Sequence, residues 1–261
     1  EAKRALQKEV SPLSTALSDD IYLNPELFQK VKYVYDNQDK MNLSREQKSL
    51  LKKVYKRFES GGANLDDAKK AQLRDLNSKL SAVQLQFSQN LLHETNNTYV
   101  TVDNVAELDG LPQANIEQAA ALAKSIGQDG KYTFNMQRPS CNPVLQYCKN
   151  RELRRKVYDA YNNRGNQNNQ WNNKALCAQI VDLRLQKAKL MGFEDYASMA
   201  LENRMAKTSD NVYKLLDQVW APAVEAAKNE IADIKAEMKK DGVNGDPERW
   251  DYRYYLDKAK A

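Results

Sequence analysis

The sequence predicts a mainly α-helical fold with several long helices and one minor element of two short strands. Apolar side chains recur every three or four residues through most of the 261-residue chain, which is the period of an amphipathic helix. Only nine glycines and seven prolines interrupt that pattern, and a chain with few helix breakers favours long helices. No stretch rich in glycine, serine and proline separates the helices, so we expect a single helical domain over residues 1–261.

Four helices are expected before the first strand. The first covers residues 2–18, and the pair Asn24 and Pro25 supplies an N-cap followed by proline at the first helical position of the second. Ser44 opens the third helix with a capping box, because a glutamine follows it three residues later. The fourth runs over residues 65–92 and would span about 40 Å, the dimension of a whole domain.

Two short strands interrupt the helices in the middle of the chain. Alternating β-branched and aromatic residues predict strands near residues 98–102 and 132–136, which we expect to pair as a small sheet. An alanine-rich helix over residues 112–126 lies between them. Another helix follows over residues 151–161, and the asparagine-rich segment 162–173 is predicted to be a long loop.

The stretch from residue 176 to residue 208 is predicted to lie at the centre of the fold. Apolar side chains in its first half form two arcs on a helical wheel, so neighbours are expected to cover this helix on two sides. Gly192 ends the helix, and a second helical segment over residues 193–205 begins directly after it, which makes a buried helical hairpin. A long helix then begins at Ser209, and Pro222 is expected to bend it.

The charge and hydropathy patterns exclude several classes of protein. Forty basic and 35 acidic residues give a net charge of +5, and the two signs are intermixed rather than gathered into the basic stripe of a nucleic-acid-binding protein. No run reaches the ~18 to 20 apolar residues that cross a bilayer. We therefore expect neither a nucleic-acid partner nor a membrane span. A signal peptide that had been removed would leave no trace, so the cytoplasm and the periplasm both stay open.

Four stretches in order along the chain resemble a known enzyme family. They are SPLSTALSDDIYLNPELFQKVKYVY at 11–35, YTFNMQRPSCNPVLQYCKNRELRRKVYDAY at 132–161, LRLQKAKLMGFEDYA followed by MA at 183–200, and WDYRYYLDKAK at 250–260. In order and spacing they are similar to the thimet oligopeptidase, oligopeptidase A and peptidyl-dipeptidase family of zinc metallopeptidases, most of all to its bacterial peptidyl-dipeptidase branch. The resemblance covers nearly the whole chain and implies a multi-helix, neurolysin-like lobe.

The resemblance also implies zinc-dependent hydrolysis of peptides. The family binds zinc through an HExxH helix, in which two histidines hold the metal and the glutamate activates water, with a further glutamate ligand downstream. This chain has one histidine. His93 is followed by Glu94, but Asn97 stands where the second histidine would be needed, so we do not assign His93 as a metal ligand. We expect no catalytic, cofactor-binding or metal-ligating residue in this chain, and zinc ligands of the parent protein outside it.

The chain is therefore expected to be an inactive fragment of a larger peptidase, in which it forms a helical lobe beside the substrate channel. Its partner would be the missing C-terminal catalytic region, and the parent would release C-terminal dipeptides from short peptides. Peptidyl-dipeptidase and endopeptidase activities cannot be separated from this sequence, because the groups that recognise a free C-terminal carboxylate are expected in the missing region. The alternative is a non-enzymatic helical scaffold or peptide-binding module, which would also lack catalytic residues.

Four side chains are candidates for the channel wall. Tyr252, Tyr254 and Tyr255 lie in the last stretch, and Arg138 follows the second predicted strand. Tyrosines at helical spacing are more often packing residues, and Arg138 is better explained as a turn residue. None of the four is assigned as a site residue on the sequence alone.

Overall fold

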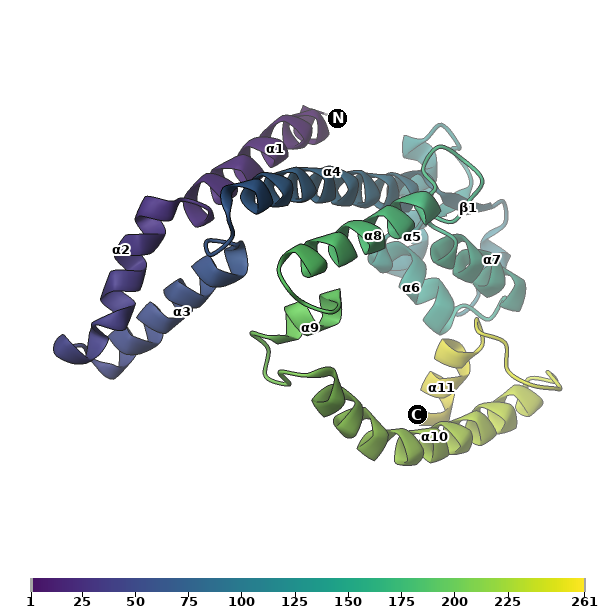
Figure 1. The fold of residues 1–261 in the computed structure, drawn as a ribbon. Coiled ribbons are helices and arrows are strands. Elements are labelled where there is room, and N and C mark those ends of the chain that lie inside the picture. The colour runs from purple at the N-terminus through teal and green to yellow at the C-terminus, as the bar shows by residue number, and fades with distance from the viewer. Residues whose placement is uncertain (1, 261) are drawn as a thin grey trace. The chain divides into compact units, whose positions relative to one another are not determined.

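The computed structural model describes residues 2–260, and within them the chain is helical except for one two-stranded sheet and the connecting loops (Figure 1). This confirms the predicted mainly α fold with a minor two-strand element. The chain divides into two compact units, of which unit 1 contains residues 1–89 and 175–212 and unit 2 contains residues 90–174 and 213–261. The folding of the whole chain as a single domain stays a prediction.

Unit 1 is built almost entirely from helices, whose predicted start signals are confirmed. Asn24 accepts a hydrogen bond from the Leu27 amide at 2.9 Å, and Ser44 forms the capping box. The first helix ends at Tyr22 rather than at residue 18, because no glycine or proline lies between residue 18 and Asn24. Pro25 then disfavours helical geometry at Asn24, the residue before it. The elements of unit 1 are α1 (Ala2–Tyr22), α2 (Pro25–Asp36), the 3₁₀ helix η1 (Gln38–Lys40), α3 (Arg45–Gly61), most of α4 (Asp67–Asn97), nearly all of α8 (Lys174–Leu190) and α9 (Tyr196–Leu201).

An aromatic cluster joins α1, α2 and α3 within unit 1. The buried rings of Phe28 and Phe58 stack with their centroids 5.9 Å apart. Tyr22 meets Phe58 edge-on at 5.1 Å, and Tyr55 stacks on Phe28 at 5.7 Å. Aromatic rings bury large apolar areas and gain further from offset and edge-to-face contacts, so this cluster stabilises the α2–α3 hairpin and its junction with α1.

A row of polar contacts links α1, α4 and α8, also within unit 1. Lys187 Nζ donates to Asn77 Oδ1 at 2.7 Å, and Asn77 Nδ2 donates to Asp19 Oδ1 at 2.8 Å. Burial raises the pKa of Asp19, against the opposing hydrogen bond from Asn77, and burial lowers the pKa of Lys187. Both shifts have the same origin, because desolvation disfavours the charged form of each group.

The prediction that α8 is covered on two sides is wrong for the part of the chain that the structure describes. Ala188 is fully buried, but the side chains of Val181 and Leu185 are 67% and 42% exposed. The second helical segment is also shorter than predicted, since α9 spans only Tyr196–Leu201 and Met205 beyond it is 99% exposed. Helical spacing tells which residues share a face, but it does not tell whether a neighbour covers that face.

Unit 2 holds the small sheet, and its two strands confirm the predicted pair. The strands are antiparallel, with Tyr99 opposite Asn135 and Val102 opposite Tyr132. Before them, α4 continues to Asn97, beyond its predicted end near residue 92. The elements of unit 2 are the end of α4, β1 (Tyr99–Val102), η2 (Val105–Leu108), α5 (Gln113–Ser125), β2 (Tyr132–Asn135), α6 (Arg138–Tyr147), α7 (Arg151–Asn162), most of α10 (Ser209–Lys240) and α11 (Tyr252–Lys260).

Unit 2 contains two clusters of buried apolar side chains. The larger packs the sheet against α5, α6 and α7, and its completely buried members are Leu108, Cys141, Val144, Cys148 and Val157. The smaller joins α10 to α11 and consists of Ile234, Met238, Tyr254 and Tyr255. Figure 1 shows α10 curved along its length, with Pro222 inside the helix. Elsewhere on α10, Trp220 is 71% exposed.

The predicted long loop is confirmed at residues 163–173, which contain no helix or strand, and hydrogen bonds hold it in place. Glu94, at the end of α4, is only 3% exposed and accepts hydrogen bonds from the Gly165 amide and, at 2.7 Å, from Asn169 Nδ2. The Asn173 amide donates to the Gly165 carbonyl at 2.7 Å. Because a buried carboxylate needs such donors, Glu94 and the loop fix each other.

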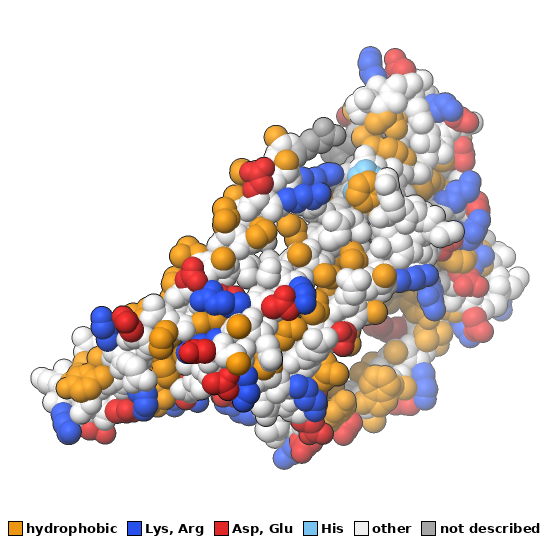
Figure 2. All heavy atoms as spheres, turned by 45° about the horizontal axis from the view of Figure 1, so that its top comes forward, with side chains coloured by type: hydrophobic (Ala, Val, Ile, Leu, Met, Phe, Trp, Pro, Cys, Tyr) orange, Lys and Arg blue, Asp and Glu red, His pale blue; other side chains and the backbone are white. Residues whose placement is uncertain are grey.

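Charged side chains of both signs are intermixed on the face shown in Figure 2, with hydrophobic side chains between them. Many of the ion pairs join residues on one helix, such as Lys32 with Asp36 and Lys79 with Asp75. Exposed pairs of this kind contribute little to stability. Within residues 2–260, no helix is both long enough and apolar enough to span a membrane.

Candidate functional site

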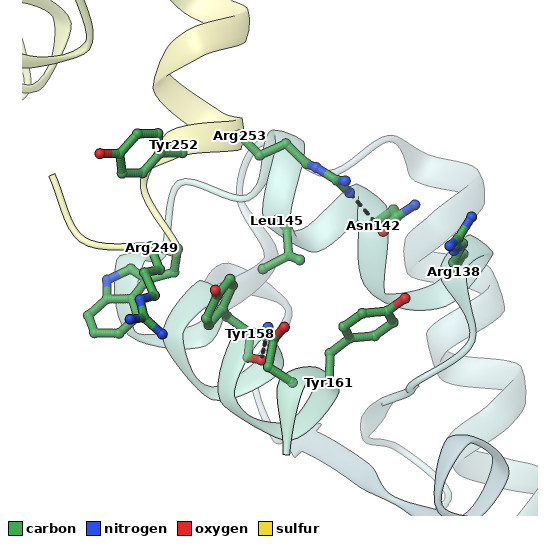
Figure 3. A pocket seen from close by; sticks show the side chains of 10 residues that line it. Arg138, Asn142, Leu145, Tyr158, Tyr161, Arg249, Tyr252 and Arg253 are labelled. Atoms are coloured by element: carbon green, nitrogen blue, oxygen red, sulfur yellow. Dashed lines mark hydrogen bonds between the residues drawn. The ribbon is translucent and has the colours of Figure 1, made fainter. Parts of the chain in front are cut away.

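A cavity of about 440 Å³ opens in unit 2 beside α6, α7 and the start of α11 (Figure 3). This volume falls in the range of roughly 300 to 1,000 Å³ that is typical of ligand pockets. The lining residues are Arg138, Asn142 and Leu145 from α6, Tyr158, Tyr161 and Asn162 from α7, Arg249 and Trp250 from the turn before α11, and Tyr252 and Arg253 from the start of α11.

Three arginines give the cavity a positive charge. Arg253 Nη1 donates to the side-chain oxygen of Asn142 at 2.8 Å, which holds this guanidinium over the cavity. Among residues 2–260, no carboxylate oxygen lies within 4.0 Å of the guanidinium nitrogens of Arg138, Arg249 or Arg253. The lining contains no aspartate or glutamate. The cavity can therefore take an anionic group without displacing a carboxylate of its own wall.

Aromatic rings form the rest of the wall. The rings of Tyr158 and Trp250 meet edge-on with their centroids 6.4 Å apart. The hydrogen bond from Arg138 lowers the pKa of the Tyr161 hydroxyl, and the guanidinium of Arg164, 3.7 Å from the centre of the Tyr161 ring, acts in the same direction. Figure 3 shows the rings of Tyr158 and Tyr161 below Arg253, with Arg249 beside Tyr158. Such rings offer an apolar surface beside the charged groups, which suits a ligand with both kinds of atom.

A buried ionic network positions the start of α11 against α7. The carboxylate of Asp251, which is completely buried, accepts hydrogen bonds from Arg151 Nη2 at 2.7 Å and from Arg154 Nη2 at 3.1 Å. The Glu248 amide donates to the same carboxylate at 3.0 Å. Burial alone would raise the pKa of Asp251, but the hydrogen bonds from Arg151, Glu248 and Arg154 together lower it. Trp250 and Tyr252, which flank Asp251 in the chain, are thereby held at the cavity.

The local sequence explains why these groups meet. Asn150 caps α7 by accepting the Leu153 amide at 3.1 Å, and the helix then places Arg151 and Arg154 on one face because they are three residues apart. Arg154 is only 1% exposed and also donates to the Trp250 carbonyl at 3.3 Å. A guanidinium has five donors in a planar fork, so one side chain can bind several acceptors of another segment at once.

The structure separates the four side chains that the sequence singled out. Arg138 and Tyr252 line the cavity, and Arg138 is the first residue of α6 rather than part of a turn. Tyr254 and Tyr255 are 5% and 2% exposed and pack in the α10–α11 cluster, as the packing alternative predicted.

Sequence reasoning missed the other cavity residues, among them both remaining arginines. The sequence did hold an indication of these residues, because eight of the ten lining residues lie in the two resembling stretches at 132–161 and 250–260, and Asn162 and Arg249 directly adjoin them.

His93 is engaged in packing. Its ring stacks on that of Trp171 with the centroids 3.9 Å apart, and the Asn97 side chain donates to the His93 carbonyl at 2.8 Å. Within residues 2–260, no three side chains of the histidine, cysteine, aspartate and glutamate types come together in a way that could hold a metal ion.

Comparison with known proteins adds evidence of relationship. The profile of Peptidase family M3 matches residues 144–261. Dipeptidyl carboxypeptidase from Escherichia coli (strain K12) is 29% identical over 255 residues, which are 98% of this chain and 37% of that protein. Oligopeptidase A from Haemophilus influenzae is 32% identical over 218 residues, which are 82% of this chain and 32% of that protein. Organellar oligopeptidase A from Arabidopsis thaliana is 27% identical over 265 residues, which are 98% of this chain and 33% of that protein.

These similarities confirm the resemblance stated for the sequence, including its reach over nearly the whole chain. The chain spans about a third of the length of the curated relatives that it matches. The match to the family profile includes most of the cavity, since only Arg138 and Asn142 lie before its first residue.

Proposed function

We propose that this relative of the M3 peptidases forms the helical substrate-channel lobe of a zinc metallopeptidase that hydrolyses short peptides. In this proposal the zinc ion and the residues that activate water belong to the C-terminal catalytic region of the parent protein. The described chain supplies the wall against which an extended peptide lies. The expected reaction of the parent is release of dipeptides from the C-termini of short peptides.

The observation that carries the proposal is the continuous similarity to a dipeptidyl carboxypeptidase over 98% of the chain. That similarity spans 37% of the relative, and oligopeptidases A match over a comparable share of their length. Sequence similarity over nearly the whole chain favours a role shared with these peptidases. The printed name of the first relative supports dipeptide release, whereas the oligopeptidase names leave internal cleavage as the other reaction.

The cavity supports a role in holding peptides rather than in bond cleavage. Its wall combines guanidinium groups, phenol hydroxyls and aromatic rings, which together can bind the charged, polar and apolar parts of a peptide. The network of Asp251 with Arg151 and Arg154 keeps one side of that wall fixed. A rigid wall favours ligands that are already extended, because a folded protein would have to unfold before its backbone could reach the cavity.

Reading the gene beyond the codon of Ala261 tests the proposal directly. An in-frame HExxH motif followed by a segment with a further glutamate is the expected result. A stop codon at that point would overturn the proposed lobe. It would favour the alternative of a peptide-binding module without hydrolytic activity. The observation that supports this alternative is the arginine-lined cavity.

Enzymatic assays of the longer product and of the 261-residue chain then test whether the catalytic residues lie outside this chain. The longer product should cleave a tetrapeptide blocked at its N-terminus into two dipeptide units, lose this activity on chelation and regain it with zinc. Cleavage at internal bonds of longer, C-terminally amidated peptides would instead indicate an endopeptidase. The 261-residue chain alone should hydrolyse no peptide and bind no stoichiometric zinc. Tight binding of one zinc ion together with peptidase activity would refute the proposal that the catalytic residues lie outside this chain.

A further inference from the structure

We propose that the arginine-lined cavity of unit 2 is a subsite that binds a carboxylate group of a peptide, and that it selects peptides on this basis. The inference rests on the proposed function in one respect, namely that the ligand is taken to be a peptide. The carboxylate has two sources in peptides, an acidic side chain or the free C-terminus. Both present the same planar pair of oxygens, and the experiment below separates them.

The first argument is the contrast between the arginines of this region. On α7, Arg151 and Arg154 bind Asp251, and Arg155 binds Glu152. The three arginines of the cavity have no carboxylate partner among residues 2–260, although α6, α7 and α11 are close together there. Ionic groups that converge on a cavity without counter-charges raise the local concentration of oppositely charged ligands.

The second argument is the type of the basic residue. All three cationic side chains that line the cavity are arginines, and none is a lysine. The guanidinium fork presents parallel donors whose spacing matches the two oxygens of a carboxylate. Lysines are available nearby in the sequence, at Lys149 and Lys156, but they do not line the cavity. The wall thus carries the chemistry of planar, two-point recognition.

The third argument is that two of the arginines are held in place, Arg253 by Asn142 and Arg138 by its hydrogen bond to Tyr161. Figure 3 shows Arg253 reaching over the cavity from α11 toward Asn142, with Arg138 beyond it and Arg249 at the opposite end near Tyr158. The hydrogen bond to Asn142 at 2.8 Å restrains Arg253. An arginine that is already oriented loses less freedom when a ligand binds, and more of its interaction energy appears as affinity.

The aromatic walls define the rest of the ligand. Tyr158, Tyr161 and Trp250 place ring surfaces beside the guanidinium groups. An inorganic anion would leave these surfaces in contact with water, whereas the methylene groups of a peptide would cover them. A peptide that carries a carboxylate therefore uses more of the cavity than a simple ion does.

Calorimetric titration of four N-acetylated tripeptides into the purified 261-residue chain tests the proposal. Acetyl-Ala-Ala-Glu-amide carries only a side-chain carboxylate, acetyl-Ala-Ala-Ala carries only a terminal one, and acetyl-Ala-Ala-Gln-amide and acetyl-Ala-Ala-Ala-amide carry none. We expect at least one carboxylate peptide to bind about tenfold or more tightly than its neutral counterpart, as a charge-assisted hydrogen bond implies. The carboxylate peptide whose affinity exceeds that of its neutral counterpart by the larger factor identifies the source of the carboxylate. Equal affinity within both pairs, or no binding by any peptide, would overturn the subsite.

Variants locate the binding in the cavity. Arg253→Gln and Arg138→Gln should each abolish most of the preference for the carboxylate peptide. Arg155→Gln removes the same charge from unit 2 at a position that does not line the cavity, and it should keep the preference. A preference that survives in both cavity variants, or that falls equally in Arg155→Gln, would overturn the assignment. Circular dichroism melting curves show whether each variant is folded, and the comparison of peptides on the unaltered chain does not depend on any variant.

Failure of the carboxylate subsite can be distinguished from failure of the proposed peptidase function. A stop codon after Ala261 would overturn the peptidase lobe while carboxylate-selective binding could still be measured. An in-frame HExxH motif together with equal affinity for charged and neutral peptides would overturn only the subsite. A competing series with sodium acetate and sodium phosphate at matched ionic strength separates the peptide from simple anions, since acetate or phosphate that bound as tightly as the carboxylate peptide would contradict a peptide subsite.

Discussion

Replacing Asp251 by asparagine should lower the stability of unit 2 by about 3 kcal/mol at neutral pH. The carboxylate accepts hydrogen bonds from Arg151, Arg154 and the Glu248 amide. Asparagine keeps one acceptor oxygen but replaces the other with a donor that faces a guanidinium donor. Removing one member of a buried ion pair typically costs about 3 to 5 kcal/mol, because the other charge is left buried without its partner.

We expect the lower end of that range because Arg154 keeps other partners. Its guanidinium also donates to the carbonyls of Cys148 at 2.8 Å and Lys149 at 3.1 Å, and its Cζ lies 4.1 Å from the centre of the Tyr254 ring. Arg151 is less affected, since its side chain is 40% exposed and can be hydrated. The loss is thus concentrated on one buried guanidinium.

Hydrogen exchange in increasing urea measures this loss in the relevant part of the chain. Peptides from residues 248–258 report on the start of α11, and peptides from α3 provide an internal reference, because two compact units need not unfold together. The matched control is Asp246→Asn, which removes an exposed carboxylate paired with Lys235 and should cost far less stability than Asp251→Asn, because water screens an exposed ion pair. Equal losses in the two variants would refute the argument that the buried network positions α11.

The pH dependence gives an independent check on the same group. The pKa of Asp251 is lower in the folded chain than in the unfolded one, so its contribution to stability is fully present above the unfolded value of about 3.9. That contribution is lost as the pH falls through the folded-state value. The difference between the original chain and Asp251→Asn should therefore be largest at neutral pH and shrink below about pH 4.

Three further predictions concern local features. Glu94→Gln removes a charged acceptor from the loop at residues 163–173, and the amides of that loop should exchange about tenfold faster or more, as measured by hydrogen exchange. Ser44→Ala breaks the capping box of α3 and should lower the stability of unit 1 by about 1 kcal/mol in urea, whereas the exposed Ser60→Ala should have an effect below about 0.5 kcal/mol. The amine of Lys187 should titrate below the exposed lysines by NMR, and stability should rise with pH between its folded and unfolded pKa values, because the unfolded chain binds more protons there.

Each of these predictions has a contradicting outcome. Glu117→Gln alters an exposed glutamate that accepts a hydrogen bond from Gln113 on the same helix, so equal loop exchange in this control and in Glu94→Gln would show that Glu94 does not hold the loop. A Ser44→Ala variant as stable as Ser60→Ala would remove the argument for the capping box. A Lys187 titration that coincides with those of exposed lysines would contradict its burial.

Short-range features of the fold were predictable because both interacting partners lie in one stretch of sequence. The caps at Asn24 and Ser44 use amides three residues along the chain. The two strands were visible as alternating runs, and the loop at 163–173 as a cluster of asparagines. The resemblance to peptidases likewise came from continuous stretches of residues, which the relatives share in the same order.

Burial was harder to predict, and α8 shows the reason. Val181 and Leu185 lie on an apolar arc that the helical spacing identified correctly, yet both are exposed in the described chain. Helical periodicity fixes which side chains share a face, while their burial depends on another segment packing there. Glu94 is the converse case, because a charged residue near a helix end is buried only when distant donors reach it, here from the loop around Gly165 and Asn169.

The sequence by itself determined the mainly α fold, the pair of short strands, most helix starts and the relationship to peptidases. Only the tertiary structure decided that Arg138, from one resembling stretch, and Arg253, from another, line a single cavity. It also decided that Asp251 binds Arg151, 100 residues earlier in the chain. The physical reason is that helix periods and caps are local interactions, whereas a cavity and a buried ion pair depend on which distant segments pack together, and no local pattern encodes that choice.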